Sequence, residues 1–109
     1  MKPVLPDILA RYFAAQNAHD IDKMVACFAP DAAVHDEGRD IIGTYAVRAW
    51  KEETSAKYRI TAEPLECTQQ NERTIVVVKV SGTFNGSPAK LAYRFGFSGE
   101  GLINALEVR

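Results

Sequence analysis

The spacing of apolar residues changes once along this 109-residue chain, and that change constrains the fold more than any other feature. Up to about Tyr58, apolar side chains recur every three or four residues, which indicates amphipathic helices. Beyond Tyr58 they alternate with polar ones, which indicates half-buried strands. Helices followed by a run of strands predict an α+β fold, with the helices on one face of an antiparallel sheet.

Three helices are expected in the first half of the chain. Pro6 and Asp7 open the first, because proline is tolerated in a first helical turn and an acidic residue there suits the helix dipole. Asp20 is a good N-cap for a short second helix, and Thr44 is a good N-cap for a third over about residues 45–55. The inward side of the third helix is expected to comprise Ala46, Val47, Ala49 and Trp50.

Four strands are expected after the helices, over residues 59–68, 74–84, 89–98 and 102–108. The short links between them are rich in Asn, Gly and Ser, which is typical of hairpins, so consecutive strands should pair antiparallel. The third of these strands alternates most clearly and should turn one set of side chains inward: Leu91, Tyr93, Phe95 and Phe97. Arg94 then belongs to the outer face, and its burial would mean a register error of one residue.

A shorter strand is expected before the third helix, at residues 32–36. Alternation places Val34 and Asp36 on one face of it and His35 on the other. If Val34 faces the core, Asp36 is a carboxylate carried inward, and such a group is either costly or useful to function. Residues 37–43, which contain two glycines, are interpreted as a polar loop.

Composition favours an ordinary globular protein, with 47% apolar and 25% charged residues and a net charge of −1. We therefore expect a single domain over residues 1–109, with neither nucleic acid nor a membrane as partner. Cys27 and Cys67 lack ligand spacing and are interpreted as reduced thiols, and His19 and His35 do not complete a metal set with them. The amino terminus has no long apolar run, so a cytoplasmic location is expected.

The order of elements and several short motifs resemble the nuclear-transport-factor-two-like superfamily, which includes SnoaL-like polyketide cyclases and ketosteroid isomerases. The resemblance covers nearly the whole chain and implies a cone-shaped, cystatin-like fold in the order αα-β-α-ββββ, with three amino-terminal helices on a strongly curved, mostly antiparallel sheet. It is carried by Arg11-Tyr12, Asn17-Ala18-x-Asp20-x-Asp22, Phe28-Ala29-x-Asp31-Ala32, Val34-x-Asp36 and Gly43-Thr44-x-Ala46-x-Arg48.

Within that superfamily the first half of the chain looks most like ketosteroid isomerase. The resemblance implies that Tyr12 matches the tyrosine of the oxyanion hole and that Asp36 matches the aspartate that shuttles a proton. The second oxyanion donor of the isomerases, a protonated aspartic acid, falls at or near Tyr93. No acidic residue lies between Ala89 and Ser98, so a tyrosine hydroxyl would have to donate that hydrogen bond here.

These residues suggest an enzyme that transfers a proton next to the carbonyl of a small apolar substrate. Asp36 would take the proton, while Tyr12 and Tyr93 would donate to the developing enolate oxygen. This chemistry requires no cofactor or metal. The expected walls of the substrate site are four aromatic side chains: Phe13, Phe28, Trp50 and Phe95.

Two alternatives remain open at this stage. The chain is either such an enzyme or a non-catalytic module that binds a ligand or oligomerises around the same cavity. Asp36 is either a base or a structural cap bonded to backbone amides of residues 37–43. His35 would replace Asp36 as base only if a bulge shifted the register of the strand.

A curved sheet covered by helices on one side leaves its other side to be explained. The outer face is expected to be flat and partly apolar, with Val77, Lys79, Thr83, Ala92 and Gly96 on it. Relatives that share the fold commonly dimerise through this surface. We therefore expect a homodimer that associates through the outer sheet face.

Overall fold

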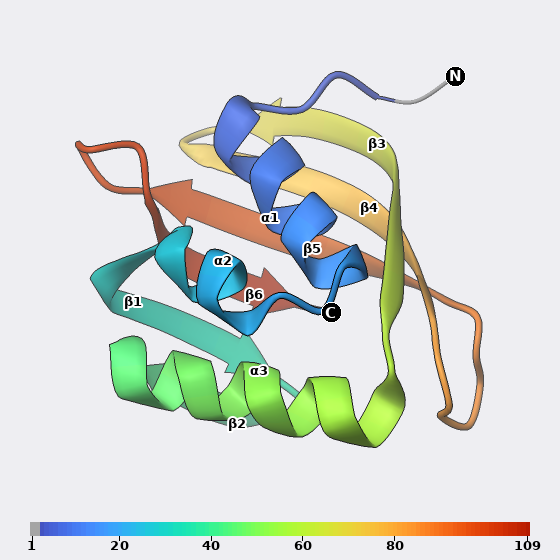
Figure 1. The fold of residues 1–109 in the computed structure, drawn as a ribbon. Coiled ribbons are helices and arrows are strands. Elements are labelled where there is room, and N and C mark those ends of the chain that lie inside the picture. Colours follow the sequence, from blue (N-terminus) through green and yellow to red (C-terminus); the bar gives the residue numbers. More distant parts are fainter. Residues whose placement is uncertain (1–2) are drawn as a thin grey trace.

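A computed structural model describes residues 3–109 and shows three helices on one face of a six-stranded sheet (Figure 1). The predicted α+β architecture is confirmed. The helices are α1 (Asp7–Asn17), α2 (Ile21–Ala26) and α3 (Thr44–Tyr58). The strands are β1 (Phe28–Asp36), β2 (Arg39–Ile42), β3 (Thr61–Gln70), β4 (Arg73–Ser81), β5 (Ala89–Phe97) and β6 (Ile103–Val108).

The strands lie in the order β2-β1-β6-β5-β4-β3. From β3 to β6 each strand pairs antiparallel with the next, as the short links predicted. The first strand then joins the last, because β1 pairs parallel with β6 and Val34 lies opposite Leu106. This pairing brings the acidic end of β1 beside the carboxyl-terminal strand, so segments far apart in the sequence share the centre of the sheet.

The interpretation of residues 37–43 as a loop is wrong, because these residues contain the turn of a hairpin and the strand β2. Glu37 and Gly38 form a two-residue turn in which both φ angles are positive, at 52° and 75°. Asp36 and Arg39 face each other across it, and this backbone geometry is the one that hairpins favour. β2 is short, charged and at the edge of the sheet, so its sequence resembles a loop.

Two of the three helices begin where the sequence predicted. Pro6 precedes α1, and the Asp20 side chain accepts a hydrogen bond of 3.1 Å from the backbone N–H of Lys23 at the start of α2. The N-cap of α3 is Gly43, with a φ of 89°, rather than Thr44. The inward side of α3 also differs from the prediction, because Ala49 is exposed and Lys51 is buried.

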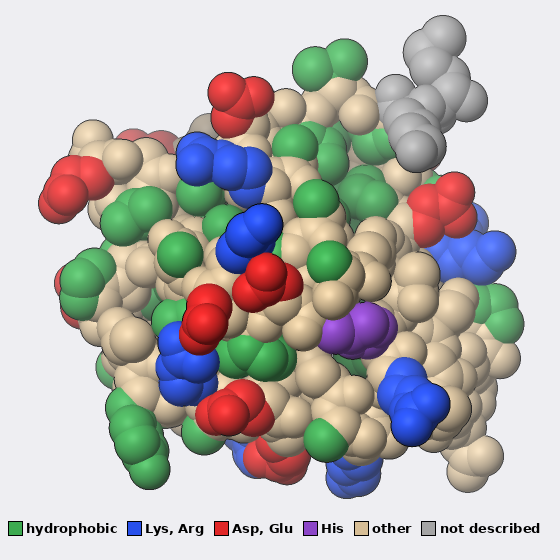
Figure 2. Space-filling model, in the orientation of Figure 1, with side chains coloured by type: hydrophobic (Ala, Val, Ile, Leu, Met, Phe, Trp, Pro, Cys, Tyr) green, Lys and Arg blue, Asp and Glu red, His purple; other side chains and the backbone are tan. Residues whose placement is uncertain are grey.

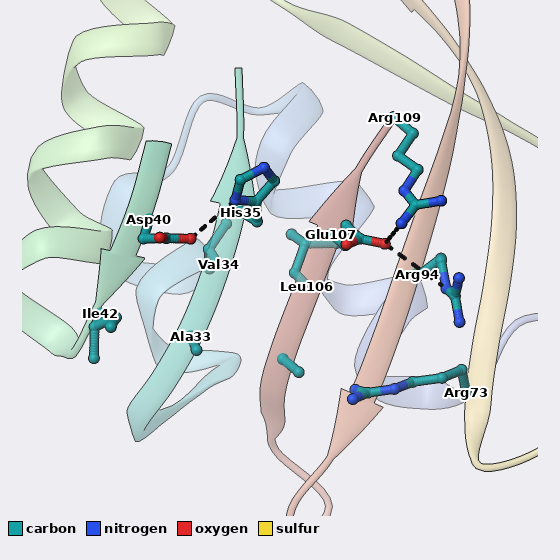
Figure 3. A pocket seen from close by; sticks show the side chains of 11 residues that line it. Ala33, Val34, His35, Asp40, Ile42, Arg73, Arg94, Leu106, Glu107 and Arg109 are labelled. Atoms are coloured by element: carbon teal, nitrogen blue, oxygen red, sulfur yellow. Dashed lines mark hydrogen bonds and ion pairs between the residues drawn. The ribbon is translucent and has the colours of Figure 1, made fainter. Parts of the chain in front are cut away.

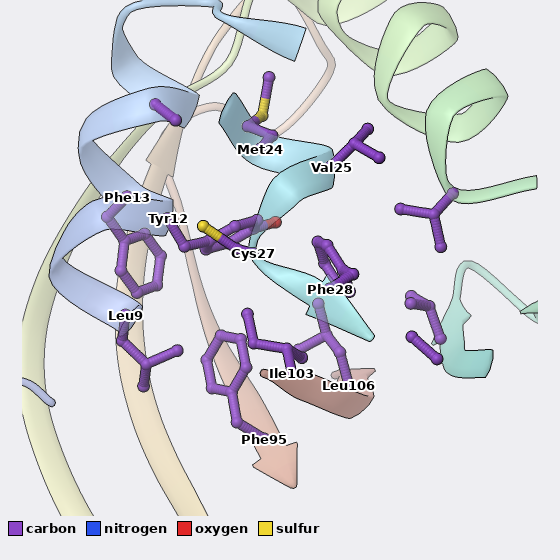
Figure 4. Packing of buried hydrophobic residues seen from close by; sticks show 14 of the residues in the cluster. Leu9, Tyr12, Phe13, Met24, Val25, Cys27, Phe28, Phe95, Ile103 and Leu106 are labelled. Carbon is purple, nitrogen blue, oxygen red and sulfur yellow. The ribbon is translucent and has the colours of Figure 1, made fainter. Parts of the chain in front are cut away.

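The core contains a layer of aromatic rings between α1, α2 and the sheet, surrounded by aliphatic side chains (Figure 4). Tyr12 packs edge-on against Phe13, Phe28 and Phe95, with ring centroids 5.3, 5.5 and 6.0 Å apart. Phe95 is fully buried, whereas Arg94 lies on the outer face of the sheet, where it meets Glu107. The register predicted for β5 is therefore right.

The helix side of the molecule carries acidic and basic side chains that are interspersed rather than gathered by sign (Figure 2). Arg48 of α3 reaches Asp22 of α2 at 2.9 Å, and Arg39 of β2 reaches Glu53 of α3 at 3.6 Å. Such exposed pairs contribute little stability individually. None of the helices in residues 3–109 is long and apolar enough to cross a membrane.

Candidate functional site

A cavity of about 380 Å³ opens between α3 and the inner face of the sheet. Its wall is mixed, with aliphatic, aromatic and polar side chains from the helices and the sheet. Such a composition is typical of small-molecule sites. The residues that line it are Gln16, Asp36, Glu37, Trp50, Lys51, Thr54, Tyr58, Ile60, Val80, Phe84, Asn85, Leu91, Tyr93 and Val108.

Asp36 ends β1 and faces this cavity, on the same side of the strand as the buried Val34. The Trp50 indole donates a hydrogen bond of 3.0 Å from Nε1 to Oδ2 of the carboxylate. No backbone N–H of residues 3–109 donates to the Asp36 side chain. The geometry therefore favours an anchored carboxylate at a cavity wall over the alternative of a loop cap.

Lys51 is the polar residue of this site that the sequence reasoning missed. It lies on α3, is only 3% exposed, and forms part of the cavity wall. Its Nζ donates to the Tyr12 hydroxyl and, at 2.9 Å, to Oε1 of Gln16. Nζ also lies over the Trp50 ring, 4.0 Å from the centroid, where the aromatic face stabilises a cation.

Burial controls the charge of Lys51. Desolvation disfavours the ammonium form and lowers the pKa of Lys51 to about 7, although the negative charge of Asp36 opposes the shift. Near neutral pH a substantial fraction of the molecules therefore carries a neutral amine at this position. The spacing in the sequence could have indicated this burial. Lys51 follows the buried Val47 by one helical turn and precedes Thr54 by another, so the three share one face of the helix.

The two tyrosines proposed as hydrogen-bond donors are both near this cluster. Tyr93 of β5 lines the cavity, and burial raises its pKa, with a further contribution from the charge of Asp36. Tyr12 is buried one layer deeper and does not line the cavity; burial raises its pKa as well. Both hydroxyls therefore stay protonated at neutral pH, and that of Tyr12 accepts its bond from Lys51.

The aromatic residues expected to line the substrate site divide into two groups. Trp50 lies at the cavity wall. Phe13, Phe28 and Phe95 do not line it; they belong to the packed layer around Tyr12 (Figure 4). The reason for the difference is the position of α1, which covers Phe95 directly, whereas Tyr93 two residues earlier in β5 reaches the cavity.

The opposite face of the sheet carries a second, shallower hollow of about 360 Å³ (Figure 3). We call this surface the outer hollow; it is lined by Ala33, Val34, His35, Asp40, Ile42, Arg73, Arg94, Ala105, Leu106, Glu107 and Arg109. His35 points into it, away from Asp36, as alternation predicted, and its Nδ1 lies 2.9 Å from Oδ1 of Asp40. Its charged groups are exposed to water, so we place the candidate site at the inner cavity.

Comparison with known proteins places the chain in a family. The SnoaL-like domain matches residues 9–102. The chain belongs to the SnoaL-like family. A candidate polyketide cyclase from Sinorhizobium meliloti is 41% identical, and the alignment covers 96% of this chain and 95% of that one with a TM-score of 0.91.

Two more distant structures share the fold of this SnoaL-like chain. An epoxide hydrolase/cyclase-like enzyme of pyran ring formation in salinomycin is 22% identical over 94% of this chain and 86% of that one, with a TM-score of 0.81. A protein with a ketosteroid isomerase-like fold from Catenulispora acidiphila, solved with trimethylamine, is 18% identical over 97% of this chain and 86% of that one, with a TM-score of 0.83. No curated protein matches the chain. These two neighbours share the fold of the chain, and the family match shows that it belongs to the SnoaL-like family.

Proposed function

We propose that this SnoaL-like chain binds a small, mostly apolar carbonyl compound and catalyses an isomerisation or cyclisation that begins with proton removal next to the carbonyl. The observation that carries the proposal is the position of Asp36, whose carboxylate faces a cavity with a mixed apolar and polar wall and is held by the Trp50 indole. The relative described as a candidate polyketide cyclase is consistent with this class of chemistry.

Asp36 is the proposed base. The indole N–H occupies Oδ2 of the carboxylate and fixes the orientation of the side chain. Oδ1 is then the atom that receives the proton from the substrate carbon, and it returns that proton to another carbon in an isomerisation. A positioned general base contributes roughly 10²- to 10⁴-fold in rate.

The enolate oxygen that forms in this step needs hydrogen-bond donors. Tyr93 and Lys51 both line the cavity and are its proposed donors. Lys51 donates in its ammonium form, which has a third N–H besides those bound to Tyr12 and Gln16. Tyr12 acts through Lys51, because its hydroxyl accepts a bond from Nζ one layer below the cavity surface. Loss of one donor of this kind costs on the order of 10²- to 10³-fold in rate.

Deuterium exchange tests the proposal without knowledge of the natural substrate. The wild-type protein is incubated in D₂O with a panel of small cyclic ketones, and proton NMR follows the loss of the signal from the hydrogens next to the carbonyl. Asp36→Asn keeps the shape of the side chain and an oxygen for the Trp50 indole but removes the base. It should slow protein-catalysed exchange by roughly 10²-fold or more.

Asp40→Asn is the matched control, because it removes a carboxylate from the outer hollow and should leave the exchange rate unchanged. An Asp36→Asn variant that exchanges as fast as the wild type would exclude Asp36 as the base. A ketone that binds in the cavity of the wild-type protein but does not exchange would support the alternative of a binding module.

A further inference from the structure

Lys51 has properties that a hydrogen-bond donor does not need. An exposed lysine is almost entirely protonated at neutral pH and is a poor nucleophile, whereas a buried one in an apolar wall loses its proton readily. Lys51 is 3% exposed, it lines the cavity, and burial lowers its pKa to about 7. The proposed proton transfer by Asp36 does not use this property.

The contacts of Nζ orient a neutral amine. Its two N–H bonds have acceptors in the Tyr12 hydroxyl and Oε1 of Gln16. The lone pair is then the one position of the nitrogen without a hydrogen-bond partner in residues 3–109. A nitrogen with a free lone pair, on a residue that lines a cavity, can attack a carbonyl carbon that enters the cavity.

The side chains around Lys51 are compatible with a neutral amine at Nζ. The titratable side chains near it are Tyr12 from α1, Asp36 from β1 and Tyr93 from β5, with Glu37 and Tyr58 further along the cavity wall. Both Tyr12 and Tyr93 have raised pKa values and stay neutral at neutral pH.

We infer that Lys51 captures the ligand covalently, forming a Schiff base with a small aldehyde or unhindered ketone in the cavity. The inference rests on the proposed function only in requiring that a carbonyl compound enters the cavity. It names a ligand class, because hindered ketones, esters and amides do not form stable Schiff bases with an amine.

The atoms balance without any further reactant. The Lys51 ammonium first releases one proton to solvent. The neutral nitrogen then attacks the carbonyl carbon, and a second proton passes from nitrogen to the carbonyl oxygen to give a carbinolamine. The hydroxyl then leaves as water and an iminium remains, so the net change is one ammonium and one carbonyl converted into one iminium and one water. The released proton returns from solvent to the leaving hydroxyl, so the adduct forms without the Asp36 carboxylate.

The residues around Lys51 are compatible with the iminium product as well as with the neutral amine. The iminium is a cation, and the Trp50 ring face lies 4.0 Å from the Lys51 nitrogen. A C–H bond next to an iminium is more acidic than one next to a carbonyl, so the adduct would ease the proton removal proposed for Asp36. The two steps therefore reinforce each other, although each can be tested alone.

Reductive trapping with benzaldehyde tests the inference. Benzaldehyde has no hydrogen next to its carbonyl, so its capture cannot depend on proton removal by Asp36. Wild-type protein is incubated with benzaldehyde and sodium cyanoborohydride, and peptide mass spectrometry locates the reduced adducts. Near neutral pH we expect Lys51 to be labelled at least about tenfold faster than the exposed lysines, because an ordinary lysine is almost entirely protonated there.

Two variants and a pH series complete the experiment. Lys51→Met should abolish the preferred adduct, and Lys57→Met, which removes an exposed lysine from the same helix, should leave it unchanged. The rate of labelling at Lys51 should rise with pH and level off above about 7, where the amine is neutral. Labelling of the wild type at exposed lysines alone would overturn the inference.

The result separates the inference from the proposed function. Asp36→Asn should still trap benzaldehyde at Lys51, since the base is not needed to form the adduct. If ketone exchange depends on Asp36 but no adduct forms at Lys51, the proposed function stands and the inference fails. If Lys51 is labelled but Asp36→Asn does not slow exchange, the inference stands and the proposed role of Asp36 fails.

Discussion

The two faces of the sheet carry similar charged residues in very different surroundings, and consecutive residues of β1 show the contrast. His35 points outward and pairs with Asp40, with side chains that are 48% and 78% exposed. Asp36 points inward, where the Trp50 indole binds it and the buried Lys51 lines the same cavity. Water screens the outer pair, whereas its exclusion from the inner side lowers the pKa of Lys51. The surroundings of these residues, rather than their types, identify the candidate site.

The largest effect on stability is expected in the aromatic layer that supports the cavity. Phe95→Ala should lower the free energy of unfolding by about 3–5 kcal/mol, because it leaves a hole under α1. Tyr45→Ala removes an aromatic ring from a residue that is 89% exposed. It should change the free energy of unfolding by less than about 0.5 kcal/mol. Urea denaturation of the two variants measures the contrast. Equal losses would show that the layer is not tightly packed.

The second effect is a dependence of the free energy of unfolding on pH, caused by the lowered pKa of Lys51. Its pKa is about 7 in the folded chain and 10.5 in the unfolded one, so between these values the unfolded chain binds more protons. The stability of the wild type should therefore rise with pH in this window, relative to that of Lys51→Met, by up to about 1.4 kcal/mol per pH unit. Below about pH 7 the charged form is fully desolvated in the fold, and the relative stability of the wild type is lowest.

Urea denaturation of the wild type and Lys51→Met at several pH values checks this slope. Lys57→Met is the control for loss of a lysine from α3 and should show no change of that size. A difference between wild type and Lys51→Met that does not vary with pH would contradict the desolvation of Lys51.

The third effect concerns the outer face of the sheet, through which a homodimer is expected and on which the outer hollow lies. Ile42 is 65% exposed there, next to the small side chains of Ala33 and Ala105. Light scattering at micromolar concentration should give twice the mass of the chain. Ile42→Glu should weaken association by about tenfold or more, because it buries an unpaired charge; Tyr45→Glu on α3 is the control. A monomeric wild type would refute the expectation.

The smallest effect is expected for the pair of His35 and Asp40. In the Ile42→Glu background, where this face meets water, His35→Gln should change the free energy of unfolding by less than about 1 kcal/mol. The change should shrink as salt is added, because salt screens exposed charges. A larger change that salt does not affect would mean that the outer pair is shielded from water in the same way as the inner cluster.

The sequence predicted those parts of the fold that local patterns specify. Alternation placed Val34 and Asp36 inward and His35 outward, and the cap at Asp20 and the hairpins between β3 and β6 are local signals as well. The parallel pairing of β1 with β6 depends on contacts between distant segments, and no local pattern contains it. The strand β2 escaped notice because its exposed charges and preceding glycine resemble a loop.

The candidate site was predictable only in part, for a similar reason. Asp36, Trp50 and Tyr93 were singled out and line one cavity. Lys51 was not, because a lysine on a helix usually faces water, and its burial depends on two acceptors from a different helix, Tyr12 and Gln16. Phe95 is expected at the cavity, but Tyr12 and Phe13 of α1 cover its ring, and spacing does not reveal where a helix lies over the sheet.

The most direct test of the central claim is an NMR titration of the Lys51 side chain. Protein labelled with carbon-13 at the lysine Cε atoms gives one signal for each lysine, and Lys51→Met identifies the one that belongs to Lys51. We expect a midpoint near pH 7 for this signal. A midpoint at the ordinary lysine value of 10.5 would show that water reaches the amine, and it would contradict the distinction between the two faces of the sheet.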